Sequence, residues 1–278
     1  MELFDNENEE KLEILKNILH KIYANMVSKR KMIRKVTTKF LRKHSFMGIS
    51  AILDFIASLI SGYVVPLNEE KLAFFMDVLI PLHKKPNCHL YYEKLVKCCI
   101  LYLEKEETLA VPLIEAILLY FPSSDSMKES LFLKELNDIF QMIKIEKYAS
   151  FLKKFIPLLL EVIIKIFVEY NLNLTSIILL LFAKPSFIAL IDFYKKDCFD
   201  ILVPLFACLT EKLNTDNDAN LLNESLSTIN DILKNLEPES NHTISTGNQF
   251  IDSIIKINMS LKNMDMALYE ISLKKSKK

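Results

Sequence analysis

The chain has 278 residues, of which only three are glycine, nine are proline and none is tryptophan, while 51% are hydrophobic. Phosphate-binding loops, dinucleotide-binding turns and tight hairpins all need glycine, so this composition argues against nucleotide-binding α/β enzymes and turn-rich β proteins. Basic and acidic residues both number 35, which excludes a uniformly basic nucleic-acid binder but says nothing about where the charges lie.

From the N-terminus onward, apolar residues recur every three or four positions, as in Leu12–Ile22 and Phe74–Leu82, and period-two alternation is rare. This spacing predicts an all-α protein of about a dozen helical segments separated by short polar breaks. An aliphatic–Pro–Leu triplet also recurs, and its last three prolines are 45 and 47 residues apart. HEAT and armadillo repeats have similar periods, so we predict a HEAT/armadillo-like α-solenoid of antiparallel helical hairpins. The triplets are centred on Pro66, Pro81, Pro112, Pro157 and Pro204.

We predict three regions along the chain. A helical repeat domain is expected over residues 1–236, a polar linker over 237–249, and a C-terminal helix with a basic tail over 250–278. The linker assignment depends on a run of Ser, Asn and Thr that also contains Pro238 and Gly247.

The sequence also contains signals that bear on compartment. The acidic N-terminus has no apolar signal segment, and charged residues interrupt the most apolar tract, so we expect neither a signal peptide nor a transmembrane segment. The five cysteines form no CxxC pair, which indicates reduced thiols and a cytoplasmic and/or nuclear protein.

No catalytic or metal-binding motif is visible. The five histidines have no HExxH spacing, there is no GxSxG sequence, and the glutamate clusters are typical of solvated helix-capping acids. We therefore expect a chain that is not an enzyme and that needs no cofactor and no metal.

Positive charge is concentrated near the N-terminus, because residues 14–53 contain ten Lys or Arg and no Asp or Glu. Within this stretch, residues at helical spacing share one face if the helix is continuous. An aromatic ring beside cationic groups suits a ligand that carries both apolar and acidic groups. The alternative is a purely structural role, in which the basic side chains are solvated and the tyrosine packs in the core. The residues of this face are His20, Tyr23, Val27, Arg30 and Arg34.

A second functional hypothesis is a helical module that binds nucleic acid or an acidic membrane through residues 14–53. The neutral total charge makes nucleic acid the less favoured partner.

From Leu15 to about Leu160 the chain resembles the B-prime regulatory subunits of protein phosphatase 2A. The resemblance implies a HEAT-like solenoid that binds the phosphatase scaffold and catalytic subunits and recruits substrates through short LxxIxE-type motifs. The family's N-terminal repeats have no counterpart before Leu15, so we expect either a shortened and diverged member or an incomplete one. The resemblance is carried by LKNILHKIY (Leu15–Tyr23), RKMIRK (Arg30–Lys35), LISGYVVPLNEEK (Leu59–Lys71), VLIPLHK (Val78–Lys84), LEKEETL (Leu103–Leu109) and FLKELNDIF (Phe132–Phe140).

Carried over position by position, the resemblance implies a motif-binding groove. At Lys21 the family has arginine, and the lysine loses bidentate geometry. At Asn68 the family has lysine, so a charge that would meet a ligand carboxylate is missing, although Lys71, at a family histidine, partly compensates. Phe55, at a family isoleucine, is expected to reshape the apolar wall. The groove residues are His20, Lys21, Tyr23, Arg30, Phe55, Leu59, Asn68 and Lys71.

The inter-helix loops of a solenoid lie along its ridges, where repeat proteins bind partners. We therefore expect some phosphatase contacts in these loops. The candidates are Glu69, Glu70, His83, Glu104 and Glu106.

Overall fold

The computed structural model describes residues 2–4, 8–43, 48–122, 125–168, 178, 185–194 and 201. All regular structure among these residues is helical, which confirms the predicted all-α class. The chain divides into two compact units, residues 1–143 and 144–278. The predicted linker and the predicted C-terminal helix and tail lie outside the described residues.

The first unit consists of α-helices joined by short 3₁₀ turns. Its elements are η1 (Glu2–Phe4), α1 (Glu9–Asn25), η2 (Val27–Lys29), α2 (Arg30–Lys43), α3 (Ile49–Ser61), α4 (Glu69–Phe74), the π-helical turn η3 (Phe75–Leu79), α5 (Ile80–Leu82), η4 (Cys88–Leu90), α6 (Tyr92–Lys105), η5 (Glu107–Leu109), α7 (Ala110–Leu119) and α8 (Ser126–Met142).

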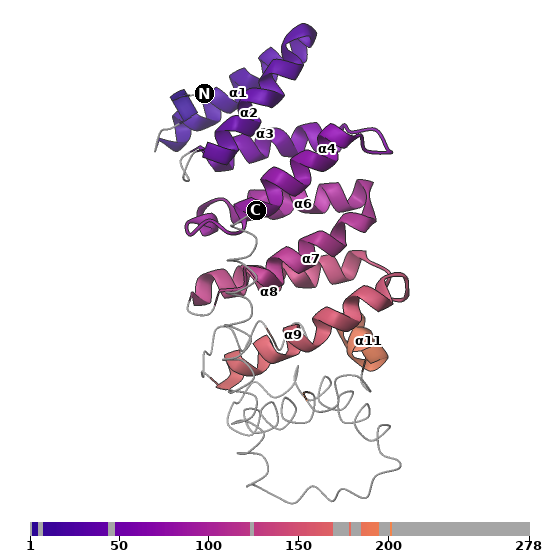
Figure 1. Cartoon of the computed structure of the whole chain (residues 1–278). Coiled ribbons are helices and arrows are strands. Elements are labelled where there is room, and N and C mark those ends of the chain that lie inside the picture. The colour runs from indigo at the N-terminus through magenta and orange to yellow at the C-terminus, as the bar shows by residue number, and fades with distance from the viewer. Residues whose placement is uncertain are drawn as a thin grey trace, which may run out of the picture. The chain divides into compact units, whose positions relative to one another are not determined.

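These helices form two layers (Figure 1). In one layer α1, α3, α6 and α8 pack one after another, and in the other α2 packs on the rod formed by α4, η3 and α5. Large aromatic side chains such as Phe55, Phe75, Tyr92 and Phe132 are fully enclosed in the first unit. The first unit is therefore an α-solenoid, as the helical spacing predicted.

The described part of the second unit contains η6 (Ile145–Tyr148), α9 (Ala149–Val168) and α11 (Pro185–Tyr194). Along α9, Leu152, Ile156, Leu159 and Ile163 are buried, and their spacing of three and four residues is that of one helix face. Every helix in the described part of the chain is too short or too polar to cross a membrane.

The prolines of the aliphatic–Pro–Leu triplets do not occupy equivalent places. Pro66 lies between α3 and α4, Pro81 follows the π-helical turn η3, Pro112 lies in the first turn of α7, and Pro157 lies inside α9. A proline ring collides with the carbonyl four residues earlier, and a wider π-helical turn before Pro81 is one way to accommodate it. Pro204 lies outside the described residues. Among the four described triplets, the spacing therefore does not mark the phase of a repeat.

The corner that leads into α3 depends on Gly48, which has a φ of 67° in the left-handed region. A Cβ added at this position would also overlap the backbone carbonyl of Phe4, whose ring packs edge-on against Phe40. Glycine is required here for both reasons.

Candidate functional site

A cavity of about 440 Å³ opens where the first four helices meet. Its lining combines apolar side chains from α3 and α4 with a row of cations from α2 and one tyrosine from α1. Five of the lining residues are Lys or Arg, and one is a carboxylate. The lining residues are Tyr23, Lys31, Arg34, Lys35, Thr37, Thr38, Arg42, Ile56, Leu59, Tyr63, Asn68, Glu70, Lys71, Ala73 and Phe74.

The basic stretch is not one continuous helix. The prediction that residues 20 to 34 share one helix face required a continuous helix, so that prediction is wrong. Helix α1 ends at Asn25, and α2 begins at Arg30 after a 3₁₀ turn. Arg30 closes this corner, because its Nε and Nη2 donate to the carbonyls of Tyr23 (2.9 Å) and Ala24 (3.1 Å). These carbonyls lie in the last turn of α1, where a helix lacks partners of its own. Arg30 therefore positions Tyr23 and does not line the cavity.

Arg34 connects the tyrosine to the far side of the cavity. Its Nη1 donates to the Tyr23 hydroxyl (3.3 Å), and its Nε donates to Oε1 of Glu70 on α4 (3.1 Å). The hydrogen bond to Tyr23 is the largest contribution that raises the pKa of Arg34. A fully charged guanidinium thus lies between an aromatic ring and a carboxylate.

The apolar side of the cavity comes from α3 and α4, through Ile56, Leu59 and Phe74. Phe55, predicted as part of this wall, is instead fully buried. Its ring packs edge-on under His20 (centroids 4.9 Å apart) and Tyr23 (5.6 Å). Residues 55 and 59 are one turn apart on the same side of α3, and Leu59 lies along the cavity while the Phe55 ring lies beneath the rings of α1. Phe55 therefore supports the site from below.

The first turn of α4 forms the remaining edge. Asn68 is the N-cap of this helix, and its Oδ1 accepts from the backbone N–H of Lys71 (3.1 Å). The Lys71 ammonium lies 4.4 Å from the centre of the Tyr63 ring. Burial raises the pKa of Tyr63 to about 12, so the phenol is neutral at physiological pH. Asn68 and Lys71 thus both lie at the edge to which the resemblance assigned the reading of an acidic group.

Four of the eight predicted groove residues line the cavity, namely Tyr23, Leu59, Asn68 and Lys71. His20 packs on Phe55, and Lys21 is exposed on α1 outside the lining. The residue-by-residue prediction omitted the cations that α2 contributes. The concentration of ten cations over residues 14–53 was the available signal for them. The cations missing from both predictions are Lys31, Lys35 and Arg42, whereas Arg34 was predicted only as a member of the basic face.

The predicted phosphatase contacts lie in different surroundings. Glu69 and Glu104 are exposed, whereas Glu70 lines the cavity. Glu106 follows the end of α6, and its Oε1 accepts from the Thr108 hydroxyl (2.6 Å). His83 corrects the expectation of a surface contact, because its side chain is completely buried.

His83 belongs to a buried polar network in the first unit. Its Nδ1 lies 2.9 Å from the carbonyl oxygen of Ile80, and its Nε2 lies 3.2 Å from Oε2 of Glu135. The Tyr92 hydroxyl donates to the same carboxylate oxygen. Cys99 brings a thiol within 4.8 Å of both the imidazole and the carboxylate, so the donor set could hold a metal ion. However, Glu135 is already occupied by Tyr92 and His83, and this network needs no metal to satisfy its polar groups.

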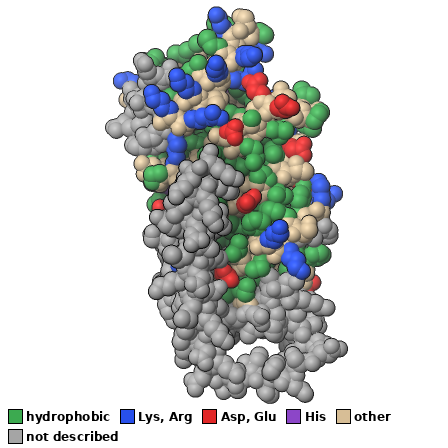
Figure 2. Space-filling view, viewed as in Figure 1, with side chains coloured by type: hydrophobic (Ala, Val, Ile, Leu, Met, Phe, Trp, Pro, Cys, Tyr) green, Lys and Arg blue, Asp and Glu red, His purple; other side chains and the backbone are tan. Residues whose placement is uncertain are grey.

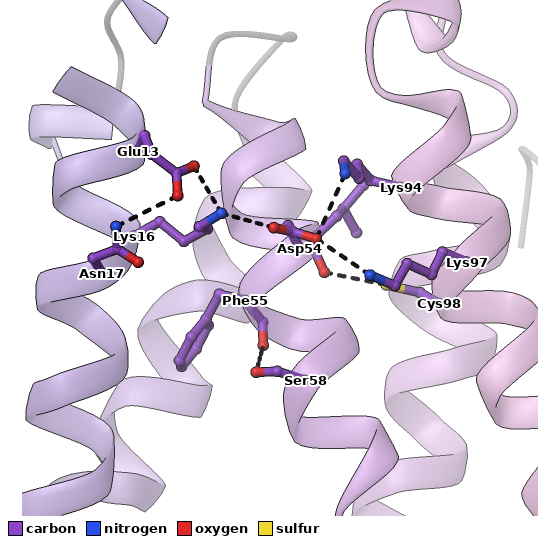
Figure 3. Close-up of polar contacts among 10 residues, drawn as sticks. Glu13, Lys16, Asn17, Asp54, Phe55, Ser58, Lys94, Lys97 and Cys98 are labelled. Carbon is purple, nitrogen blue, oxygen red and sulfur yellow. Dashed lines mark hydrogen bonds and ion pairs between the residues drawn. The ribbon is translucent and has the colours of Figure 1, made fainter. Parts of the chain in front are cut away.

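A second charged cluster connects three helices of one layer (Figure 3). Lys16 on α1 donates to Oδ2 of Asp54 on α3 (2.8 Å), and Lys94 and Lys97 on α6 approach Oδ1 of Asp54 to 3.7 and 3.6 Å. The hydrogen bond from Lys16 is the main cause that lowers the pKa of Asp54. This cluster ties the layer together on the surface of the solenoid.

Cations gather at the end of the first unit where α1 and α2 lie (Figure 2). Within the described residues, Lys31, Lys35 and Lys71 have no carboxylate within ion-pairing distance. The neutral chain therefore has a local excess of positive charge at the cavity.

Residues 1–249 match the family described as protein phosphatase 2A regulatory B subunit (B56 family). The chain belongs to the B56 family. The B-prime resemblance predicted from the sequence is thereby confirmed, and the expectation of a non-catalytic chain agrees with a family of regulatory subunits.

Similar B56 proteins occur in distant organisms. The chain is 37% identical over 153 residues to the 56 kDa regulatory subunit delta 2 isoform of Schizosaccharomyces pombe, covering 53% of this chain and 24% of that protein. It is 34% identical over 207 residues to regulatory subunit psrA of Dictyostelium discoideum, covering 70% and 33%. It is 36% identical over 149 residues to the human 56 kDa regulatory subunit alpha isoform, covering 52% and 31%. The chain thus spans about a quarter to a third of the length of these relatives.

Proposed function

We propose that this B56 chain is a regulatory and substrate-targeting subunit of serine/threonine protein phosphatase 2A. It binds the scaffold and catalytic subunits and captures substrates that carry a short LxxIxE-like motif in the cavity between α1, α2, α3 and α4. The observation that carries this proposal is the lining of that cavity, which combines an apolar wall with five cationic side chains.

The two sides of the cavity suit the two kinds of group in such a motif. Aliphatic side chains of an extended peptide pack against Ile56, Leu59 and Phe74, which removes apolar surface from water. An acidic side chain of the same peptide accepts charge-assisted hydrogen bonds from Arg34 and Lys71. A peptide that offers only one kind of group gains only part of this binding free energy.

Binding a motif in this way raises the local concentration of the substrate near a catalytic subunit carried by another chain. Support for phosphatase partners comes from the names of the relatives, which are regulatory subunits of phosphatase 2A. Exposed acids such as Glu69 and Glu104 remain candidates for these contacts.

Peptide binding tests this proposal. A labelled LxxIxE-type peptide is titrated with the full chain and with Lys71→Ala, and Kd is measured by fluorescence polarisation. Loss of one charge-assisted hydrogen bond should weaken binding by about tenfold or more. Lys39→Ala, an exposed lysine of α2 outside the cavity lining, is the control and should bind as the unaltered chain does. Equal affinity of all three proteins for the peptide would show that the cavity is not the peptide-binding site.

The exposed cations of α2, including Lys31, Lys35 and Lys39, favour a second candidate function, which is binding of an acidic membrane or of nucleic acid. Such binding would not depend on the apolar wall and would fall steeply with salt concentration. Tight, salt-sensitive binding to anionic vesicles or to nucleic acid, unchanged in a Leu59→Ser variant, would favour this second function.

A further inference from the structure

The single carboxylate of the cavity lining, that of Glu70, already forms an ion pair with one of the lining cations, Arg34. Glu70 Oε1 accepts from Arg34 Nε at 3.1 Å, while Arg34 Nη1 donates to the Tyr23 hydroxyl at 3.3 Å. An acidic ligand that enters the cavity therefore meets an arginine edge that is bound by a carboxylate of the protein itself.

The bond between Glu70 and Arg34 is placed where it can exchange. The side chain of Glu70 is 58% exposed and that of Arg34 is 33% exposed, so water reaches both groups. Solvent-exposed ion pairs contribute little net stability and are screened by salt. A carboxylate held in place by further contacts of a bound peptide can thus displace Glu70 at small cost.

The neighbouring glutamate is in a different position. Glu69 is exposed and does not line the cavity, although both acids belong to the first turn of α4. Both interact similarly with the N-terminal end of this helix, because the helix dipole favours negative charge there. The two positions thus differ mainly in whether the carboxylate reaches Arg34.

We infer that Glu70 is an internal competitor for acidic peptides, and that a carboxylate of the bound peptide replaces it at Arg34. This inference deepens the proposed function and rests on it. In the free protein Glu70 neutralises the charge of Arg34. An acidic ligand must displace Glu70 to reach Arg34, and the free energy of this displacement weakens its binding. A neutral peptide leaves the pair intact. Glu70 therefore lowers the affinity of the cavity for acidic peptides and reduces its preference for them over neutral ones.

The test compares Glu70→Gln with Glu69→Gln in the full chain. Two probes are used, an LxxIxE-type peptide and its analogue with glutamine in place of the final glutamate, and Kd is measured for each. Glu70→Gln should bind the acidic peptide roughly two- to fivefold more tightly than the unaltered chain, in line with the strength of exposed ion pairs. Glu69→Gln should show little change, although it alters the total charge equally. The preference for the acidic peptide over its glutamine analogue should grow only in Glu70→Gln.

An added Arg34→Gln substitution separates the arginine contact from general charge repulsion. In this background Glu70→Gln should no longer tighten binding, because the Arg34 guanidinium for which Glu70 and the peptide compete is absent. Equal effects of Glu70→Gln and Glu69→Gln would overturn the inference and leave the proposed function standing. If none of the proteins binds the acidic peptide, the proposed function fails and the inference fails with it. Binding by Glu70→Gln alone would support the competition and overturn peptide capture by the unaltered chain.

Discussion

His83 shows how a residue can carry a functional signal in the sequence and a structural role in the fold. It lies beside a predicted inter-helix loop, and such loops line the ridge of a solenoid, so the sequence predicts a surface position. In the structure, Nδ1 donates to the carbonyl of Ile80, because a carbonyl oxygen can only accept. Nε2 then faces the Glu135 carboxylate at 3.2 Å, and this contact is attractive only if a second proton lies between them.

The charge state of His83 gives a pH-dependent contribution to stability. Burial opposes protonation, but the Glu135 carboxylate and hydrogen bonds to the backbone of Ile80 and Leu79 together raise the pKa of His83. A group whose folded pKa is raised contributes its stability below the unfolded value, near 6.5, and loses it as pH rises through the folded value. The groups that face the imidazole and belong to this balance are Glu135 on α8 and Tyr92 and Cys99 on α6.

The substitution Glu135→Gln tests this contribution. At pH 6 the variant should lose about 3 kcal/mol of unfolding free energy, because a buried ion pair is broken. The difference from the unaltered chain should shrink as pH rises to 9. Denaturant unfolding at several pH values measures it. A difference that is the same at pH 6 and pH 9 would show that His83 is neutral throughout.

At the scale of elements, helical spacing predicted most helices but could not reveal where a helix ends without a proline or glycine. Residues 25–30 continue the spacing of α1 and contain neither, yet the chain turns at Met26. The turn is held by Arg30, which contacts carbonyls six and seven residues earlier, and such a contact has no signature in periodicity. For the same reason Phe55 and Leu59, both apolar and one turn apart, could not be divided between core and cavity.

The Asp54 cluster joins three helices through one carboxylate, so its removal should affect the packing of α1, α3 and α6 together. Asp54→Asn leaves Lys94 and Lys97 without this partner, and we expect a loss of about 1 kcal/mol in unfolding free energy. Since the pKa of Asp54 is lowered in the folded chain, the contribution is present above the unfolded value and lost as pH falls through the folded one.

A matched control is available on the second layer. Asp77 pairs with Arg42 at 3.7 Å, and both side chains are more than half exposed, so Asp77→Asn should change stability little. Thermal unfolding at low and high salt compares the two variants. The effect of Asp54→Asn should diminish in high salt. Equal melting temperatures for both variants would show that the cluster does not couple the three helices.

At the scale of the whole molecule, the formal charge of zero hides a strong separation of charge. The cations over residues 14–53 and the acids elsewhere cancel in the sum, yet the cavity is lined by five cations and one acid. The family, the helical class and part of the cavity lining could be predicted from the sequence. The Glu70–Arg34 and His83–Glu135 pairs could not, since their partners are 36 and 52 residues apart and meet only through packing of helices.

Association with phosphatase 2A, which the proposed function requires, is tested on the whole chain. A tagged chain should recover phosphatase 2A scaffold and catalytic subunits from an extract of its own cells at physiological salt, detected by mass spectrometry. Lys71→Ala should recover both equally well, because the proposed function assigns the cavity to substrates and not to the phosphatase. Recovery of neither subunit by the unaltered chain would contradict its role as a phosphatase subunit.

Asn68 places a constraint on how this site can diverge. Its side chain caps α4 and at the same time lines the cavity, at a position where the B-prime resemblance implies lysine. A lysine would bring another positive charge to the ligand but could not accept the backbone N–H of Lys71, and loss of an N-cap costs about 1 kcal/mol. One side chain therefore serves both the start of α4 and the cavity lining, so a substitution at Asn68 changes both at once.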